Sequence, residues 1–281
     1  MSGCYGRAEV IGHVGELLQG AVRMAGSLEP FLITLPAPSI RSEAVATRAD
    51  EWRVEPGCKT KALQAVREAA RRWDVGFCAK ISIRSSAPIG RGYGTSTSDC
   101  SAAIHAVAAL AERTAGPREV AAIVAKVEGA SDSTMFGTRP VAFLSRRGRC
   151  LRRFNRRWPL LHVLPFDLGG PPVDSASEPV PDYSREEIEE FGHLLNAAAA
   201  GFSTGDAKAL AAVATRSAAI HQRHRPQTGY AALVRRCAEH AADGLAISHS
   251  GTAAALLFAR PYAGCYALGQ VETMENACPS F

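Results

Sequence analysis

The sequence predicts an α+β fold that is divided into two domains. Short segments rich in β-branched and apolar residues, separated by Pro and Gly, dominate the first 60 residues and are typical of strands. Three segments with apolar residues at helical spacing follow one another in the second half. A chain of 281 residues can form two packed domains, and we place these at residues 1–160 and 161–281.

The first half is expected to mix strands and helices. Alternating or β-branched segments predict strands at Ala8–Ile11, Pro30–Leu35, Arg41–Arg48 and Cys78–Ser85. Apolar residues at helical spacing predict helices at Lys61–Trp73, Ser96–Arg113 and Pro117–Val127. Val141–Ser145 and Cys150–Phe154 are expected to pair as a hairpin.

The second half is expected to begin with a strand at Leu160–Pro165. Gly, Pro and Ser then predict a loop over Asp167–Tyr183. Helices are predicted at Glu186–Ala200, Asp206–His221 and Tyr230–Ala242. Two last strands, Leu245–Ser248 and Ala253–Phe258, flank a turn of small residues.

The composition excludes several classes of protein. The content of 47% hydrophobic and 21% charged residues is ordinary for a globular chain and argues against disordered and fibrous proteins. No apolar run reaches the roughly 18 residues of a membrane-spanning helix, and the N-terminus lacks the pattern of a secretory signal. We therefore expect no membrane partner and a cytoplasmic location. The eight cysteines lie at least 13 residues apart, which argues against zinc sites built from close pairs.

Much of the formal charge of +5 lies in the stretch from Arg146 to Arg157, which holds seven arginines. We favour a solvated rim of the predicted hairpin. The alternative is a surface for nucleic acid or another anion. Because no paired aromatic residues accompany the arginines, we expect no nucleic-acid partner.

The most informative segment runs from Pro88 to Asp99 (PIGRGYGTSTSD), between a predicted strand and a predicted helix. Gly90, Gly92 and Gly94 would let the backbone pass close to a bulky anion. The helix start that follows would offer free N–H groups and a partial positive charge, which suits a polyphosphate. We expect Ser96 to cap this helix, with Asp99 as the acid of a capping box. A glycine-rich connector without a ligand is the alternative.

Other phosphate-binding patterns do not fit this segment. The G-x-x-x-x-G-K-[ST] and G-x-G-x-x-G patterns are both absent. The H-R-D and D-F-G motifs of protein kinases do not occur either.

The segment PIGRGYGTS resembles the P-x-x-x-G-L-G-S-S motif of the GHMP superfamily, which includes galactokinase, homoserine kinase, mevalonate kinase and phosphomevalonate kinase. GHVGELLQG, at residues 12–20, resembles the first motif of that family, and ISHSGTAA, at residues 247–254, resembles the third. The resemblance implies a two-domain GHMP kinase fold, with an N-terminal ribosomal-protein-S5-like α/β domain and a C-terminal ferredoxin-like α+β domain.

Within this superfamily the chain is most similar to the L-threonine kinases of cobalamin side-chain synthesis. VGELLQG, GRGYGTSTSD, EGASDSTMF and SHSG resemble four motifs of that subgroup. The chain departs from the subgroup at three places: His13-Val14 replaces Ser-Cys, Gly129-Ala130 replaces Pro-Thr, and Tyr93 replaces a smaller apolar residue.

The resemblance implies ATP and Mg²⁺ as the nucleotide and metal. It assigns nucleotide binding to Pro88, Ile89, Gly90, Arg91, Gly92, Tyr93, Gly94, Thr95, Ser96 and Thr97. It assigns magnesium to the hydroxyl of Ser96, with Glu128 as the candidate carboxylate. The alternative for Glu128 is an exposed residue at a helix end.

Asp132 is the candidate catalytic residue, because a carboxylate in a polar turn can accept the proton of a substrate hydroxyl. The alternative is an Asx-turn aspartate. The cationic groups of His221–Arg225 could bind a substrate carboxylate. Six residues are candidates for substrate contact: Glu16, Gln19, Ser131, His249, Ser250 and Gly251.

These residues lead to three hypotheses for function. The first is an L-threonine kinase that makes O-phospho-L-threonine. The second is a kinase for another small hydroxyl compound, such as serine, homoserine or an amino alcohol. The third is a nucleotide-binding homologue without turnover. A homodimer is left open by the sequence.

Overall fold

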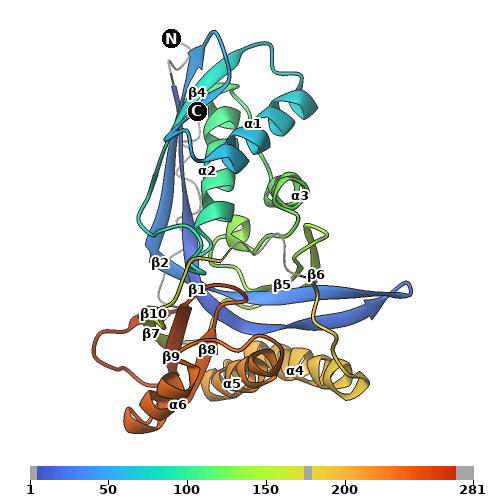
Figure 1. Ribbon diagram of the computed structural model, residues 1–281, viewed down its shortest axis with the longest axis vertical. Helices are drawn as coiled ribbons and strands as arrows, with labels where there is room; N and C mark the ends of the chain where they lie inside the picture. Colours follow the sequence, from blue (N-terminus) through green and yellow to red (C-terminus); the bar gives the residue numbers. More distant parts are fainter. Residues whose placement is uncertain (1–4, 174–178, 270–281) are drawn as a thin grey trace.

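The structure is a computed structural model that describes residues 5–173 and 179–269. Its strands form one ten-stranded sheet. Eight of them follow the order β10-β7-β9-β8-β1-β2-β4-β3, while β5 pairs with β2 and β6 pairs with β5. The helices cover this sheet in two groups, one from each half of the sequence (Figure 1).

A long antiparallel hairpin of β1 (Tyr5–Met24) and β2 (Ser27–Ala49) runs through both halves of the molecule (Figure 1). Ala25 and Gly26 form its turn with φ values of 47° and 83°, a conformation that matches the twist of paired strands. The three separate strands expected in this region are parts of β1 and β2. Register shifts interrupt the pairing between Ile11 and Leu18, and such irregularities bend a strand and redirect its side chains.

The first half adds β3 (Arg53–Glu55), α1 (Thr60–Trp73), β4 (Cys78–Ser85), α2 (Thr95–Leu110) and α3 (Pro117–Glu128). The helices lie together on one face of the sheet (Figure 1). Alanines on α2 permit an unusually close approach to β1: a Cβ on Gly6 would lie 2.1 Å from the carbonyl oxygen of Ala106. Small residues on both elements are therefore required where α2 crosses the hairpin.

The middle of the chain contains the 3₁₀ turn η1 (Thr134–Phe136), β5 (Val141–Leu144), β6 (Arg149–Arg153) and β7 (Leu161–Asp167). The second half then provides α4 (Arg185–Thr204), α5 (Ala207–His224), α6 (Tyr230–Glu239), β8 (Gly244–Ile247), β9 (Ala253–Phe258) and β10 (Tyr266–Leu268). A capping box of Ser184 and Glu187 starts α4, and Gly205 ends it in the left-handed conformation.

The hairpin contributes side chains to the cores of both halves. Val10, Ala44 and Ala46 pack with α1, α2 and β4 in the first core. Val14, Leu17 and Leu18 pack with residues of α4, α5 and β9 in the second core. The division into domains at residue 160 stays a prediction, because one sheet is continuous across it.

The predicted helices are present, with ends that differ by a few residues. The three-residue strands β3 and β10 and the turn η1 were not expected, since segments this short carry little periodicity. Among the described residues, no helix combines the length and the apolar character that a membrane crossing requires.

Candidate active site

A cavity of about 510 Å³ lies between the two halves. Its walls come from the N-terminal hairpin, the start of α1, the glycine-rich loop before α2, the turn after α3, and segments of the second half. The first-half residues that line it include Glu16, Lys59, Gly92, Ser96, Glu128 and Asp132, and the second-half residues include Tyr183, Arg225, His249 and Ser250.

The glycine-rich loop has a conformation that other residues would not adopt easily. Gly90, Gly92 and Gly94 have φ values of 79°, 83° and 66°. A Cβ on Gly92 would lie 2.4 Å from the backbone oxygen of Ser250, and one on Gly94 would lie 2.3 Å from the ring of His13. Glycine is thus needed at Gly92 and Gly94 for two reasons, the positive φ and the close contacts.

Backbone hydrogen bonds fix this loop from both sides. The amide of His13 donates to the oxygen of Tyr93 at 3.0 Å. The amides of Thr252 and Ala253 both donate to the oxygen of Arg91 at 2.8 Å. The turn around Gly251 therefore packs directly against Arg91 and Gly92. Pro88, by contrast, accepts from the hydroxyl of Thr95 at 3.2 Å and does not line the cavity.

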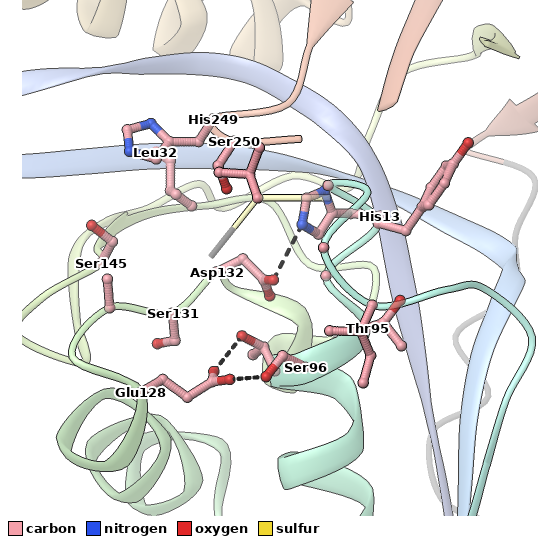
Figure 2. A pocket seen from close by; sticks show the side chains of 18 of the residues that line it. His13, Leu32, Thr95, Ser96, Glu128, Ser131, Asp132, Ser145, His249 and Ser250 are labelled. Carbon is pink, nitrogen blue, oxygen red and sulfur yellow. Dashed lines mark hydrogen bonds and ion pairs between the residues drawn. The ribbon is translucent and has the colours of Figure 1, made fainter. Parts of the chain in front are cut away.

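Two hydroxyl groups at the start of α2 point to a buried carboxylate on α3. Ser96 donates to Oε1 of Glu128, and Thr97 donates to Oε2 at 2.7 Å (Figure 2). Glu128 is buried, so it is not an exposed residue at a helix end. Burial raises its pKa to about 7, although the two hydroxyl donors oppose this effect.

The expected capping box at the start of α2 is absent. Gly94 is the N-cap residue and no side chain caps the helix. Asp99 instead lies beneath the loop, where it accepts from the hydroxyls of Ser42 and Ser85, both at 2.6 Å, and pairs with Lys59. This prediction was wrong because the partners of Asp99 come from other strands and from the start of α1, which local spacing does not reveal.

Asp132 lines the cavity and is held by two contacts. Its Oδ2 lies 3.1 Å from Nε2 of His13 (Figure 2). Its Oδ1 accepts from the amide of Thr134 at 3.0 Å. The second contact is the Asx-turn bond that the sequence also suggested. The turn therefore orients the carboxylate, while its other oxygen faces His13.

The irregular part of β1 brings His13 and Glu16 to the same site. Gly15 lies between them with a φ of 82°, and Nδ1 of His13 is 3.8 Å from Oε1 of Glu16. Burial would lower the pKa of His13, but the carboxylates of Asp132 and Glu16 outweigh burial and raise it. Burial raises the pKa of Glu16 to about 8. Near pH 7 Glu16 is therefore mainly protonated, and the carboxylate groups around His13 favour its imidazolium form.

Only some of the other candidate substrate residues line the cavity. Ser131 and Ser250 line the cavity, whereas Gln19 and Gly251 do not. Gln19 lies behind His249 and accepts from its Nδ1 at 3.0 Å. Gln19 therefore acts on the cavity through His249 rather than through its own contact.

Several residues that line the cavity were not expected there, among them His13, Lys59, Asp99 and Arg146. The position of His13 could have been noticed from the sequence, because this residue departs from the subgroup motif there. Arg146 was grouped with the exposed arginines of the hairpin. No sequence pattern predicts the pairing of Lys59 with Asp99, because it depends on the packing of α1 against α2.

The arrangement suits the transfer of a phosphoryl group. The loop backbone and the start of α2 form a concave site for an anion, and the oxygens of Ser96, Thr97 and Glu128 are the kind of ligands that Mg²⁺ prefers. Asp132 provides a carboxylate within the same cavity that can accept a proton.

Comparisons with known proteins identify the fold of the chain. Residues 60–138 match the family described as "GHMP kinases N terminal domain". No curated protein sequence matches the chain. Among solved structures, mevalonate kinase from methicillin-resistant Staphylococcus aureus MRSA252 is similar with a TM-score of 0.61 and 15% identity over 92% of each chain. Homoserine kinase from Cytophaga hutchinsonii has a TM-score of 0.65 and 13% identity over 89% of this chain and 84% of its own.

A further structure, described as MDDEF in complex with MVAPP, AMPPCP and magnesium, has a TM-score of 0.62 and 13% identity over 90% of this chain and 89% of its own. At these identities the comparisons establish the fold. The expectation of an α+β GHMP kinase fold is confirmed. Residues 60–138 match the N-terminal domain of the GHMP kinases, and the chain has the fold of the GHMP kinase superfamily.

Proposed function

We propose that this chain is a small-molecule kinase that transfers the γ-phosphoryl group of ATP to the side-chain hydroxyl of L-threonine, giving O-phospho-L-threonine. The observation that carries this proposal is that one cavity is lined by the glycine-rich loop, the Ser96–Glu128 pair and Asp132. A cavity with an anion site, a metal-type oxygen pair and a proton acceptor contains the parts that phosphoryl transfer requires. The similarity of motifs to L-threonine kinases supports the choice of acceptor.

Magnesium fits the residues that are present. Ser96, Thr97 and Glu128 place hydroxyl and carboxylate oxygens together in a buried site next to the loop. Burial raises the pKa of Glu128 despite its two hydroxyl donors and the charge of Lys61, so a divalent cation beside this carboxylate would favour its ionised form. Magnesium, when bound there, would neutralise charge on the phosphates. One of the fold relatives was solved with AMPPCP and magnesium.

The protein groups then have distinct tasks in the reaction. Amides of residues 90–96 hold the phosphates of the nucleotide. Asp132 orients the acceptor hydroxyl and takes its proton as the new O–P bond forms and the bond to the leaving ADP oxygen breaks. His13 directs the Asp132 carboxylate, because its Nε2 lies 3.1 Å from Oδ2 of Asp132 and an imidazolium at this position would form a charge-assisted hydrogen bond.

A screen of ATP consumption tests the proposal. The purified protein is incubated with ATP and Mg²⁺ in the presence of L-threonine, L-serine, L-homoserine or small amino alcohols, and ADP and the phosphorylated product are measured. We expect the highest kcat/KM with L-threonine. Homoserine is included because a homoserine kinase shares the fold. Faster turnover of homoserine or serine would support the kinase function but would identify a different acceptor. Nucleotide binding without turnover of any acceptor would contradict the proposal and favour a non-catalytic homologue.

A further inference from the structure

Two arginines and a neutral histidine line the cavity together. Arg225 follows the last turn of α5, and Arg146 follows β5 in the first half, yet both line the same cavity as His249. Burial, followed by the guanidinium groups of Arg225 and Arg146, lowers the pKa of His249 to about 3. Both cations are therefore close enough to His249 to act on its charge.

Hydrogen bonds fix the tautomer of His249 and the direction of Arg225. Nδ1 of His249 faces the amide oxygen of Gln19 at 3.0 Å, so Nδ1 carries the proton. Nε2 then has a free lone pair, and Nη1 of Arg225 lies 3.4 Å from it. Nη2 of Arg225 donates to the oxygen of Pro179 at 2.6 Å. These two hydrogen bonds hold the guanidinium of Arg225 at the cavity wall.

The two ends of the cavity are arranged around Asp132. Figure 2 shows Ser96 and Glu128 on one side of Asp132 and His249 with Ser250 on the other. A phosphate held by the loop and an acceptor hydroxyl at Asp132 would leave the rest of the acceptor directed toward His249. In this orientation the end of the acceptor that is farthest from its hydroxyl would lie beside the guanidinium groups.

We propose that Arg225, together with Arg146, binds a carboxylate of the acceptor, and that Arg225 is the residue by which the site selects hydroxy acids over the corresponding amino alcohols. This inference rests on the proposed kinase function. A guanidinium presents a planar fork of donors that matches a carboxylate, and its contact with the neutral His249 sets the orientation of that fork.

The experiment compares acceptors that differ only in the carboxylate. L-threonine is paired with 1-amino-2-propanol, and L-serine with ethanolamine, and kcat and KM are measured for each compound with the wild-type chain, Arg225→Gln, Arg225→Lys and Arg146→Gln. We expect the wild type to prefer each amino acid over its amino alcohol. Loss of a hydrogen-bonded charge contact should raise the KM for the amino acids about 10- to 100-fold in Arg225→Gln, while the KM for ATP and the constants for the amino alcohols change little.

Arg223→Gln is the matched control. Arg223 lies two residues earlier on α5 and pairs with Glu187 at 3.3 Å instead of lining the cavity, so its loss should not change the preference. Thermal melts identify any variant that is not folded. The comparison of amino acids with amino alcohols in the wild type needs no variant, so it tests the inference even if a variant fails to fold.

The outcomes separate this inference from the kinase proposal. Equal use of amino acids and amino alcohols by the wild type would overturn the inference and leave the kinase intact. An equal loss of activity toward both kinds of acceptor in the folded Arg225→Gln variant would overturn the selective role of Arg225. Absence of turnover with every acceptor would contradict the kinase function itself, and the inference with it.

Discussion

Three acids and one histidine decide the chemistry of the site at the scale of single residues. Glu16, Glu128 and Asp132 are all buried and line one cavity, and His13 contacts Asp132 and lies near Glu16. Burying a charge is unfavourable unless a partner compensates for it. The pKa values of Glu16 and Glu128 are raised accordingly, to about 8 and about 7, which is typical of functional sites.

Replacing Asp132 by Asn tests its role as the proton acceptor. An Asn side chain can still accept from the amide of Thr134, so the turn should persist. It cannot take up a proton, and kcat should fall by roughly 10²- to 10⁴-fold. Nucleotide affinity, measured by titration calorimetry, should change little. Asp50→Asn, in an exposed bend, is the control. Near-normal turnover in Asp132→Asn would show that another group accepts the proton.

Replacing Glu128 by Gln tests its burial through the pH dependence of stability. The folded-state pKa of about 7 exceeds the usual value of 4.5, so the unfolded chain binds fewer protons than the folded chain between these values. The free energy of unfolding contributed by Glu128 is therefore fully present below pH 4.5 and is lost as the pH rises through about 7.

The Gln side chain does not titrate, so Glu128→Gln should gain stability relative to the wild type as the pH increases. From the shift of the pKa the gain is on the order of 3 kcal/mol at pH 8. Thermal melts without magnesium, recorded from pH 4.5 to 8, provide the measurement. A difference in Tm that does not vary with pH would mean that Glu128 is ionised at no cost in the folded chain.

The residues of the candidate site differ in how far they could be predicted. Asp132, Ser96 and Glu128 lie in segments that resemble motifs of a known family, and the structure places all three at the cavity. Lys59 and Asp99 form a pair across 40 positions of sequence. Arg225 and His249 meet only because β8 and α5 pack together. Local patterns carry no information about such contacts, which arise from the tertiary structure.

The glycine-rich loop is the decisive feature at the scale of elements. Gly92→Ala would place a Cβ 2.4 Å from the backbone oxygen of Ser250, on a residue with a φ of 83°. The loop must then move, and its amides would no longer converge on a phosphate. We expect a loss of stability and a rise of at least about tenfold in the KM for ATP, since charged hydrogen bonds are lost.

Gly26→Ala separates the effect of the positive φ from the effect of the contact. Gly26 has the same φ of 83°, but a Cβ there would meet no atom within 4 Å. This control should cost about 1–2 kcal/mol through the left-handed conformation alone and leave the KM for ATP unchanged. Equal effects of the two variants on melting and on KM would show that the packing of Gly92 is not required.

The helices were better predicted than the strands. Apolar residues at helical spacing predict α1, α3 and α4 within a few positions of their observed ends. The hairpin was not predicted as one unit, because its turn at Ala25 and Gly26 lacks the Asn-Gly or Asp-Gly pair that identifies such turns. The bulged part of β1 also breaks the alternation of apolar and polar residues on which strand prediction depends.

At the scale of the whole molecule, the N-terminal hairpin joins the two halves. Leu17 is fully buried in the core of the second half, although it lies within the first strand. Because β1 and β2 complete both cores, we expect the two halves to unfold together. Calorimetry should give a van't Hoff enthalpy equal to the calorimetric enthalpy.

Leu17→Ala provides the second test of this cooperativity. The substitution should lower the free energy of unfolding by about 2–5 kcal/mol. It should shift the transition reported by Trp52 and Trp73, which pack on the first core, as far as that reported by Trp158 in the second core. Two separate transitions, with only that of Trp158 displaced, would show that the halves are independent domains.

The account depends most on the binding of a nucleotide triphosphate at the glycine-rich loop. A crystal structure of the chain with AMPPCP and magnesium tests this directly. We expect the phosphates within hydrogen-bonding distance of the amides of residues 90–96, with the metal between them and the oxygens of Ser96 and Glu128. A nucleotide bound elsewhere, with the loop at Gly92 unchanged and empty at saturating concentration, would contradict it.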